Sequence, residues 1–203
     1  MAAKFQQLAQ TKSVHRAQTH YYGKTLYVPG APEQAHDALT EDEISFIQSR
    51  DSFYMGTVSE TGWPYIQHRG GPAGFLHVLG PSALAFADLK GNRQLLSTGN
   101  LAAGDRVALF LMDYPQQTRL KIMGHARIED AREHPELVAQ LADPEIQRSV
   151  ERLFFIDVVS FDWNCPQHIT QRFTAAEIKE QIVKPLLQRI TELETHLANI
   201  PTK

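Results

Sequence analysis

The sequence is poor in the features that mark oxidised, membrane-bound or strongly charged proteins. Its 203 residues include a single cysteine, Cys165, which excludes an intramolecular disulfide and suits a reducing, cytoplasmic setting. No apolar run approaches the length of a membrane span, and the first residues lack the apolar core of a signal peptide. The net charge of −3 gives no overall attraction to nucleic acid or to an acidic membrane surface. We therefore expect no nucleic-acid or membrane partner, and any basic site must be local.

Sequence motifs of several enzyme classes are also missing. The chain has no HExxH, CxxC, Gly-x-Ser-x-Gly or Walker sequence, and no strand–GxGxxG–helix unit. A Rossmann cofactor site is therefore not expected. Nine histidines are present, but none is paired at a metal-ligand spacing with a carboxylate partner, so we predict no metal site. Cys165 stands three residues before His168, and both a packed thiol and a reactive thiolate stay open for it.

Two glycine-containing turns that each carry an arginine stand in the middle of the chain. One is His68-Arg69-Gly70-Gly71-Pro72, and the other is Lys90-Gly91-Asn92-Arg93. Two apolar segments between them, 76–79 and 83–86, meet at Gly80-Pro81. They are predicted to form a β-hairpin, which would bring the two turns towards one place.

The residue types in these turns suit an anion. Arginine offers a fixed fork of donors that matches phosphate, and glycine lets the backbone approach an anion closely. The pattern therefore favours a phosphate-bearing ligand near Arg69 and Arg93. Two ordinary turns with solvated arginines would have the same sequence, and that alternative stays open.

Apolar periodicity and turn residues predict six or seven short strands and several short helices. Thr40-Glu41-Asp42-Glu43 and Thr174-Ala175-Ala176-Glu177 are capping boxes that each begin a helix. We expect strands near residues 53–59, 63–69, 76–79, 83–86, 105–112, 119–128 and 153–161. We expect helices near residues 5–8, 41–50, 92–101, 133–141 and from 174 onward. Serial antiparallel hairpins with outlying helices indicate a mainly β (α+β) fold, a β-barrel with peripheral helices.

Three segments are expected along the chain. Residues 1–39 are polar and turn-rich, and form either an arm laid over the body or a disordered tail. Residues 40–173 hold the barrel domain, and residues 174–203 form a C-terminal helix that Pro185 should kink or restart. An apolar stripe of this helix is expected to pack on the barrel or on a partner subunit: Ile182, Leu186, Ile190, Leu193 and Leu197.

Several short motifs follow one another in a specific order along the chain. They are His68–Phe75, Phe86–Arg93, Asn100-Leu101, Ala108–Tyr114, Arg119–Ala126 and Trp163–Ile169. Their order and spacing resemble one known family, the pyridoxamine 5′-phosphate oxidase-related flavoproteins. The resemblance covers about residues 40–173 and is closest to the branch that ends in Asn-Cys-Pro-Gln-His-Ile. It implies a split β-barrel that binds FMN, usually as a homodimer with two flavins at the subunit interface.

The resemblance implies roles for the residues that match. Arg69 stands where the oxidases have an arginine that reaches the flavin. Gly91-Asn92-Arg93 replaces their Ser-Arg-Lys phosphate clamp, so phosphate would be held by Arg93, the Asn92 side chain and the amides at the start of the following helix. Arg119 replaces a glutamine at the isoalloxazine edge, where a fixed cation favours the anionic reduced ring. A solvated strand residue is the alternative for Arg119.

The remaining matches complete the cofactor set. Gln167 and His168 would close over the flavin from the partner subunit, and Trp163 packs near the flavin or in the core. The cofactor-binding residues that the resemblance implies are His68, Arg69, Gly70, Phe86, Ala87, Asp88, Gly91, Asn92, Arg93, Asn100, Arg119, Gln167 and His168.

One departure bears on the substrate. The oxidases end with a Trp and then an Arg-Leu-x-Pro-like segment that holds the substrate phosphate, and here only Trp163 and Arg172 correspond. Oxidation of pyridoxamine phosphate itself is therefore not expected. The resemblance implies an FMN-dependent oxidoreductase that passes electrons from a small-molecule donor to a small acceptor. A non-catalytic FMN-binding, storage or sensing protein is the alternative, and haem or a deazaflavin is a third. No catalytic residue is assigned.

Overall fold

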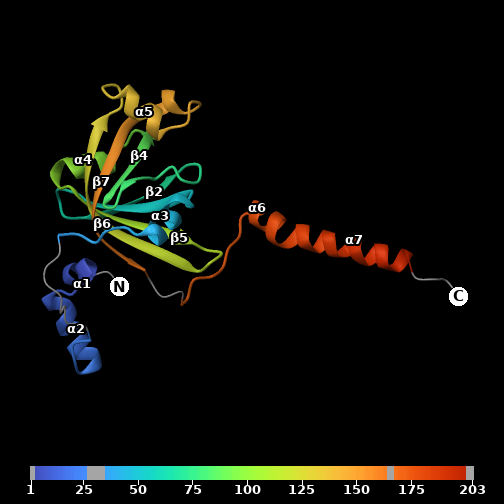
Figure 1. Ribbon diagram of the computed structural model, residues 1–203. Coiled ribbons are helices and arrows are strands. Elements are labelled where there is room, and N and C mark those ends of the chain that lie inside the picture. Colours follow the sequence, from blue (N-terminus) through green and yellow to red (C-terminus); the bar gives the residue numbers. More distant parts are fainter. Residues whose placement is uncertain (1–2, 27–34, 164–166, 200–203) are drawn as a thin grey trace. The chain divides into compact units, whose positions relative to one another are not determined.

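Seven strands form one sheet in the computed structural model, which describes residues 3–26, 35–163 and 167–199 (Figure 1). Their spatial order is β2-β1-β5-β6-β7-β4-β3. The β1–β2, β1–β5, β3–β4, β4–β7 and β6–β7 pairs are antiparallel. The strands are β1 (Ser52–Val58), β2 (Pro64–Gly70), β3 (His77–Gly80), β4 (Ala83–Leu89), β5 (Arg106–Asp113), β6 (Thr118–Asp130) and β7 (Val150–Trp163).

The chain divides into two compact units. One comprises Met1–Asp113 and Arg119–Cys165, and the other comprises Tyr114–Thr118 and Pro166–Lys203. The domain limits expected from the sequence, at 39/40 and 173/174, stay predictions. Asn164, Cys165 and Pro166 lie outside the described residues, and so do the roles considered for Cys165.

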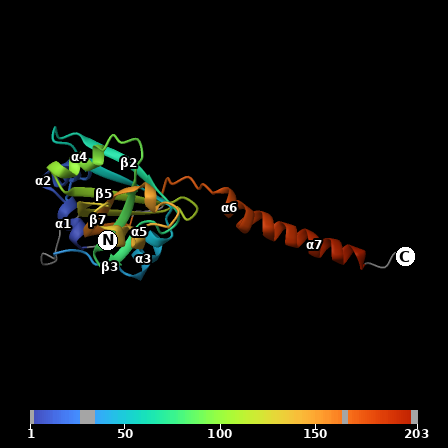
Figure 2. The same ribbon diagram turned by 90° about the horizontal axis from the view of Figure 1, so that it is seen from above.

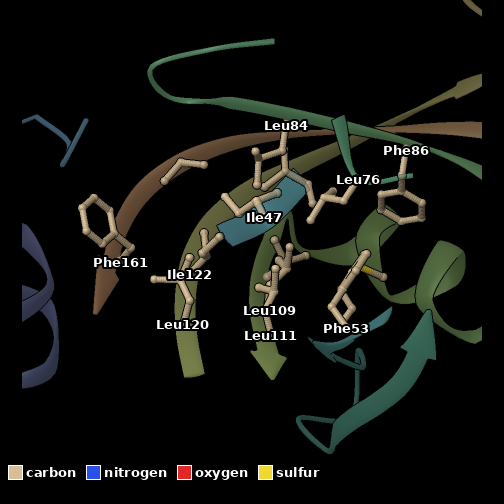
Figure 3. Packing of buried hydrophobic residues seen from close by; sticks show 14 of the residues in the cluster. Ile47, Phe53, Leu76, Leu84, Phe86, Leu109, Leu111, Leu120, Ile122 and Phe161 are labelled. Atoms are coloured by element: carbon tan, nitrogen blue, oxygen red, sulfur yellow. The ribbon is translucent and has the colours of Figure 1, made fainter. Parts of the chain in front are cut away.

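Alternating side chains of the strands build the core of the first unit. Along β6, Leu120, Ile122, Gly124 and Ala126 are buried and Lys121, His125 and Arg127 are not, as the sequence predicts. Figure 3 shows Ile47, from the helix before β1, among core residues from several strands. The labelled residues in that view are Ile47, Phe53, Leu76, Leu84, Phe86, Leu109, Leu111, Leu120, Ile122 and Phe161, all of which are buried.

The helices of the first unit are α1 (Ala3–Ala9), α2 (Lys12–Tyr22), α3 (Glu41–Gln48), α4 (Leu96–Ala103) and α5 (Pro135–Leu141), with a 3₁₀ turn at Gln147–Ser149. Four of these helices, α1, α3, α4 and α5, contact strands of this sheet, whereas α2 points away from it (Figures 1 and 2). The sequence predicted one short helix before residue 39, but two are present. The backbone N–H groups of Lys4 and Phe5 donate to Asp37 at 3.0 and 3.1 Å, which ties α1 to the body.

Helix α3 begins at the predicted capping box. The Glu43 carboxylate accepts from the Thr40 backbone N–H at 2.9 Å, and it also accepts from the indole N–H of Trp163. The Trp163 ring meets Phe46 edge to face, with centroids 4.8 Å apart. Burial opposes ionisation of Glu43, but these hydrogen bonds outweigh it and hold the pKa of Glu43 below its ordinary value. Trp163 therefore packs against α3, at the edge of the core.

The second unit is held together by contacts between its two segments. The Gln117 side-chain amide donates to the Ile169 carbonyl at 2.6 Å, and that of Gln171 donates to the Pro115 carbonyl at 2.8 Å. The Arg172 guanidinium lies 5.0 Å from the ring centroid of Tyr114. The helical part that follows comprises α6 (Ala175–Ile178), a π-helical stretch (Lys179–Val183) and α7 (Lys184–Ala198).

The sequence predicted that the helix is kinked or restarted at Pro185, and the structure has the π-helical stretch directly before α7, which begins one residue before this proline. Proline has no N–H to give to the carbonyl four residues earlier, so the hydrogen-bond ladder is rearranged at that point. Among the described residues, no helix has both the length and the apolar character needed to cross a membrane.

Candidate functional site

A cationic cavity of ≈ 260 Å³ opens between β2, the end of β4, the loop after β4 and α4. Arg69, Lys90, Arg93 and Arg152 line it together with one carboxylate, Asp88. The other lining residues are Tyr65, Gln67, Leu89, Gly91, Asn92, Gln94, Leu95, Leu96, Ser97 and Thr98. Four cations around one carboxylate give the cavity a net positive charge, which favours an anion as its ligand.

Strand alternation decides which side chains of β2 reach the cavity. Tyr65, Gln67 and Arg69 lie on one face of β2, in register with inward-facing residues of β1. His68 lies on the opposite face, where it is exposed and meets the ring of Tyr54 at a centroid distance of 5.6 Å. His68 and Arg69 were both predicted to bind the cofactor, but their side chains point to opposite faces of β2.

Asp88 joins two arginines at the floor of the cavity. The β4–β7 register sets Asp88 opposite Arg152, whose Nε donates to Asp88 Oδ2 at 2.8 Å. Arg69 pairs with the other oxygen of the same carboxylate. The Arg69 guanidinium also lies over the rings of Phe86 and Phe154, at 5.6 and 5.1 Å from their centroids. The floor of the cavity therefore consists of the ion triad Arg69, Asp88 and Arg152, in which Arg69 packs on aromatic rings of the core.

Burial makes Arg69 unusual for an arginine. Its side chain is 11% exposed, and this desolvation lowers its pKa despite the favourable charge of Asp88. The Arg69 Nε is buried and has no hydrogen-bond partner among the described residues. A ligand with an acceptor atom at this place would be favoured, because the Arg69 Nε–H could then donate a hydrogen bond that it does not make among the described residues.

The loop after β4 has a left-handed backbone at alternate residues. Gly91, Arg93 and Leu95 have φ values of 48°, 60° and 56°, while Asn92 and Gln94 between them are not in that region. In anion-binding nests, left-handed and right-handed residues alternate so that successive backbone N–H groups face one concave surface, and left-handed residues at alternate positions are one half of that pattern. The Asn92 side-chain oxygen accepts from the Gln94 N–H at 3.2 Å, which stabilises the turn.

This loop corrects one prediction about the phosphate clamp. The helix was expected to start at the Gly91-Asn92 turn, but α4 begins at Leu96, after a left-handed N-cap at Leu95. The local hydrogen bond of Asn92 favours a turn over a helix. The amides nearest Arg93 therefore belong to a loop and not to a helix start.

Helix α4 lies beside β2 (Figure 2), and two hydrogen bonds fix it in that place. The buried Ser97 hydroxyl donates to Gln67 Oε1 at 2.8 Å, which links α4 to β2. The Asn100 amide donates to Thr57 Oγ1 at 2.9 Å, which links α4 to β1. Asn100, predicted at the cofactor, does not line the cavity but holds the helix that does.

The structure brings five of the predicted residues to the cavity: Arg69, Asp88, Gly91, Asn92 and Arg93. Phe86 lies beneath Arg69 in the core, at 1% exposure. Gly70 and Ala87 line a different cavity of ≈ 380 Å³ beside α5. The predicted set is thus spread over two faces of β4, because Asp88 and Ala87 are neighbours in an alternating strand.

Arg119 lies on the outer face of the sheet. Its guanidinium is 6.0 Å from the ring centroid of Phe110, and its Nε is buried with no hydrogen-bond partner in the described part of the chain. Phe110 pairs with Tyr54, and Tyr54 pairs with His68, so these three residues form one row across β5, β1 and β2 on the face that also carries Arg119.

Gln167 and His168 belong to the second unit and are exposed. His168 has a left-handed φ of 65°. Their predicted place over a flavin stays a prediction.

Ten of the fifteen lining residues were not in the predicted set, among them Tyr65, Gln67, Lys90 and Arg152. Tyr65 and Gln67 precede Arg69 by four and two residues, so the alternation of the strand carried the signal for both. Arg152 is brought to the cavity by the β4–β7 register, which no local pattern gives. In the described part of the chain, no group of three or more His, Cys, Asp or Glu side chains is arranged to hold a metal ion.

The structure thus combines an antiparallel sheet, surrounding helices and a cationic cavity at the strand ends. The pyridoxamine 5′-phosphate oxidase family model matches residues 39–155, more than half of the chain. The chain belongs to this family, and the predicted mainly β split-barrel fold is confirmed. The narrower branch, defined by its Asn-Cys-Pro-Gln-His-Ile ending, stays a prediction. No curated protein sequence matches the chain.

Solved structures of similar fold carry differing descriptions. A candidate pyridoxamine 5′-phosphate oxidase from Lactobacillus delbrueckii is 21% identical, with a TM-score of 0.49 over 62% of this chain and 94% of that chain. An F420 reductase is 15% identical, with a TM-score of 0.44 over 61% and 98%. The heme storage protein HutZ from Vibrio cholerae is 16% identical, with a TM-score of 0.42 over 58% and 89%.

Proposed function

We propose that the protein binds FMN, with the phosphate of the cofactor in the cationic cavity. The observation that carries this proposal is the set of Arg69, Lys90, Arg93 and Arg152 around a space of ≈ 260 Å³ with one opposing carboxylate. Membership of a family whose members commonly bind flavin supports FMN as the phosphate-bearing ligand.

The residues present fit a phosphate monoester. Arg93 is exposed on the loop and has free guanidinium donors to give, while Arg69 and Arg152 are already held in place by Asp88. The left-handed loop at Gly91 adds backbone N–H groups. Arginine binds phosphate through paired, charge-assisted hydrogen bonds, which are about twice as strong as neutral ones. The single carboxylate leaves the cavity cationic after its own charge is counted.

We further propose that the protein is an oxidoreductase for a small-molecule donor and acceptor. Bound FMN would supply hydride and single-electron chemistry, while the chain binds it, orients it and sets its electrostatic surroundings. Arg119 is the cation on the outer face that would favour negative charge on the reduced ring. Its buried and unpaired Nε supports a ligand contact at that place.

A second copy of the chain is proposed to complete the site. An apolar groove of ≈ 600 Å³ crosses the outer face of β2, β1 and β5 where Gly56 and Ala108 leave room between larger residues. Ile66 and Val58 beside it are 69% and 50% exposed. Large apolar side chains around a groove favour a partner surface, and a homodimer accounts for them.

Replacing Arg93 by alanine tests the phosphate assignment. Loss of a charged hydrogen-bond donor to phosphate removes about 1.5–3 kcal/mol, so the dissociation constant for FMN should rise at least about tenfold. Quenching of flavin fluorescence on titration with protein measures it. Arg132→Ala is the matched control, because Arg132 is a surface arginine paired with Asp130 outside the cavity. Equal affinity in both variants would contradict the assignment.

Absorbance of the purified protein tests the redox role. Flavin bands that bleach with reduced nicotinamide under anaerobic conditions, and return with an electron acceptor, support the oxidoreductase. Flavin that binds but is not reduced by any donor favours the non-catalytic alternative, since retention alone only stabilises the protein by mass action. A haem or deazaflavin spectrum would contradict FMN as the cofactor.

A further inference from the structure

The helix α7, together with Val183 at the end of the π-helical stretch before it, carries a heptad seam that nothing in its own segment covers. Val183, Leu186, Ile190, Leu193 and Leu197 follow one another at spacings of three, four, three and four residues, which are the a and d positions of a coiled coil. Every residue of α7 is exposed, and Ile190 and Leu197 are 50% and 66% exposed. A straight helix that only covers a globular body does not need this 3.5-residue period.

We propose that α7 pairs with α7 of a second copy of this chain as a parallel, in-register, two-stranded coiled coil. The residue types in the seam favour a coiled coil of two helices. The first two a positions hold the β-branched residues Val183 and Ile190, and the two d positions hold leucine, Leu186 and Leu193. A symmetric dimer brings identical helices together across its two-fold axis, so no other partner is needed.

The flanking residues select the parallel orientation. In a parallel pair, each g position faces the e position five residues further along the other helix. Arg189 then faces Glu194 of the second copy, an opposite-charge pair made twice by symmetry. Ile182 faces Leu187 of the second copy, which accounts for two apolar residues outside the seam, 45% and 58% exposed.

The antiparallel orientation fits these residues poorly. Setting Ile190 against Leu186 of the second copy brings Arg189 next to Arg189 and Glu194 next to Glu180. It also leaves Leu197 opposite Lys179. Like charges along a helix pair are unfavourable, so charge selects one orientation. The Arg189 bond to Glu192 within the helix, at 2.9 Å, uses one of several guanidinium donors and leaves others for the pair.

The length of the seam sets how strong this contact is. The 15 residues of α7 span roughly 22 Å at 1.5 Å per residue, and isolated helices of about that length are marginal in water. The pair would therefore form within the proposed homodimer, where the effective concentration of the second helix is high. The inference rests on that proposed homodimer and does not depend on FMN binding.

A cysteine at Leu193 tests the pairing in the full chain. In a parallel in-register coil, the two residues at position 193 face each other within disulfide range, so Leu193→Cys should form a covalent dimer on mild oxidation. The matched control is Glu192→Cys, one residue outside the seam. Both are made with Cys165→Ser, so that the new thiol is the only one.

Several-fold more covalent dimer from Leu193→Cys than from Glu192→Cys on a non-reducing gel is the expected result. Equal cross-linking of the two variants would overturn the proposal. So would a mixture of Val183→Cys and Leu193→Cys chains that joins 183 to 193 in preference to 193 with 193, because that product is antiparallel. FMN affinity measured on the same variants is expected to be unchanged, so a failed cross-link with normal FMN binding rejects the coil alone.

Charge exchange gives a second, non-covalent test. Glu194→Arg should weaken the cross-link at Leu193→Cys, because Arg189 would then face arginine. Adding Arg189→Glu should restore it. Recovery in the double exchange supports the parallel register, whereas no loss in Glu194→Arg would overturn the assigned g–e pair.

Discussion

Helix α3 and the helix formed by α6 and α7 begin with the same sequence signature, but α3 is partly buried in the core and α7 is exposed throughout. Each opens with Thr-x-x-Glu, and in each the glutamate accepts a hydrogen bond from the backbone N–H of the threonine. In α3 the residue Ile47 is completely buried and the box residue Glu43 is 4% exposed. In α7 every residue is exposed, including the whole apolar stripe.

This difference in burial shows that the residues which start a helix do not decide whether the helix is buried. A capping box satisfies the first backbone N–H groups by local contacts, and those contacts are the same in both helices. Burial depends on what lies beside the helix, and α3 lies on the core cluster while α7 presents a seam of its own. The two helices thus form a natural comparison, in which matched substitutions should differ in effect.

The largest difference is expected for the apolar residues. Ile47→Ala should lower the free energy of unfolding of the first unit by about 2–5 kcal/mol, because it opens a cavity in the core. The matched Leu186→Ala, at a residue 58% exposed, should change it by less than about 0.5 kcal/mol. Urea unfolding followed by tryptophan fluorescence measures both. Similar losses in the two variants would show that the stability of the sheet depends on contacts of α7, which would contradict the comparison.

A smaller and pH-dependent difference is expected for the two glutamates. The folded pKa of Glu43 is below its ordinary value, so its charge stabilises the fold above about pH 4.5, and that stabilisation is lost as pH falls through the folded pKa. Glu43→Gln should therefore be less stable than the parent by about 1–3 kcal/mol at pH 7, and the gap should narrow in acid. Glu177→Gln is the control. A gap that stayed constant from pH 7 to pH 3 would contradict the role of the Glu43 charge.

The smallest effect is expected from the cap of the exposed helix. In Thr174→Ala the Glu177 N–H loses its 3.2 Å bond to the threonine hydroxyl, which should weaken the start of α6 by about 1 kcal/mol. Hydrogen exchange of the amides at 175–178 should speed up while urea unfolding of the sheet stays unchanged. Unaltered exchange in this variant would mean that contacts other than the cap hold the start of α6.

Local sequence patterns predicted most elements of the fold. Alternation gave the buried face of β6, and the two capping boxes gave the starts of α3 and α6. The start of α4 was wrong by several residues, since a side-chain turn at Asn92 competes with the helix in a way that average propensity does not show. The second helix before residue 39, α2, was missed because its sequence is polar, with no buried residue to set a stripe.

Residues of the candidate site were predictable only where a local motif in one strand or turn contains them. Arg69 and Arg93 stand beside glycines, and the hairpin between them brings both to the cavity. Arg152 stands 64 residues from Asp88, and only the β4–β7 register joins them. His68 was placed with Arg69 because sequence neighbours were taken together, but adjacent strand residues face opposite sides.

The ion triad of Arg69, Asp88 and Arg152 has a consequence for the thermodynamics of binding. Both guanidinium groups are fixed before any ligand arrives, with side chains 11% and 15% exposed. Immobilising a long side chain on binding costs about 0.5–1.5 kcal/mol, and these two have already been immobilised by folding. Arg93 is exposed on its loop and must be ordered at the moment of binding. The proposed phosphate site is thus rigid at its floor and adaptable at its rim. A phosphate would meet two fixed guanidinium groups there and would order the exposed side chains of Arg93 and Lys90 on binding.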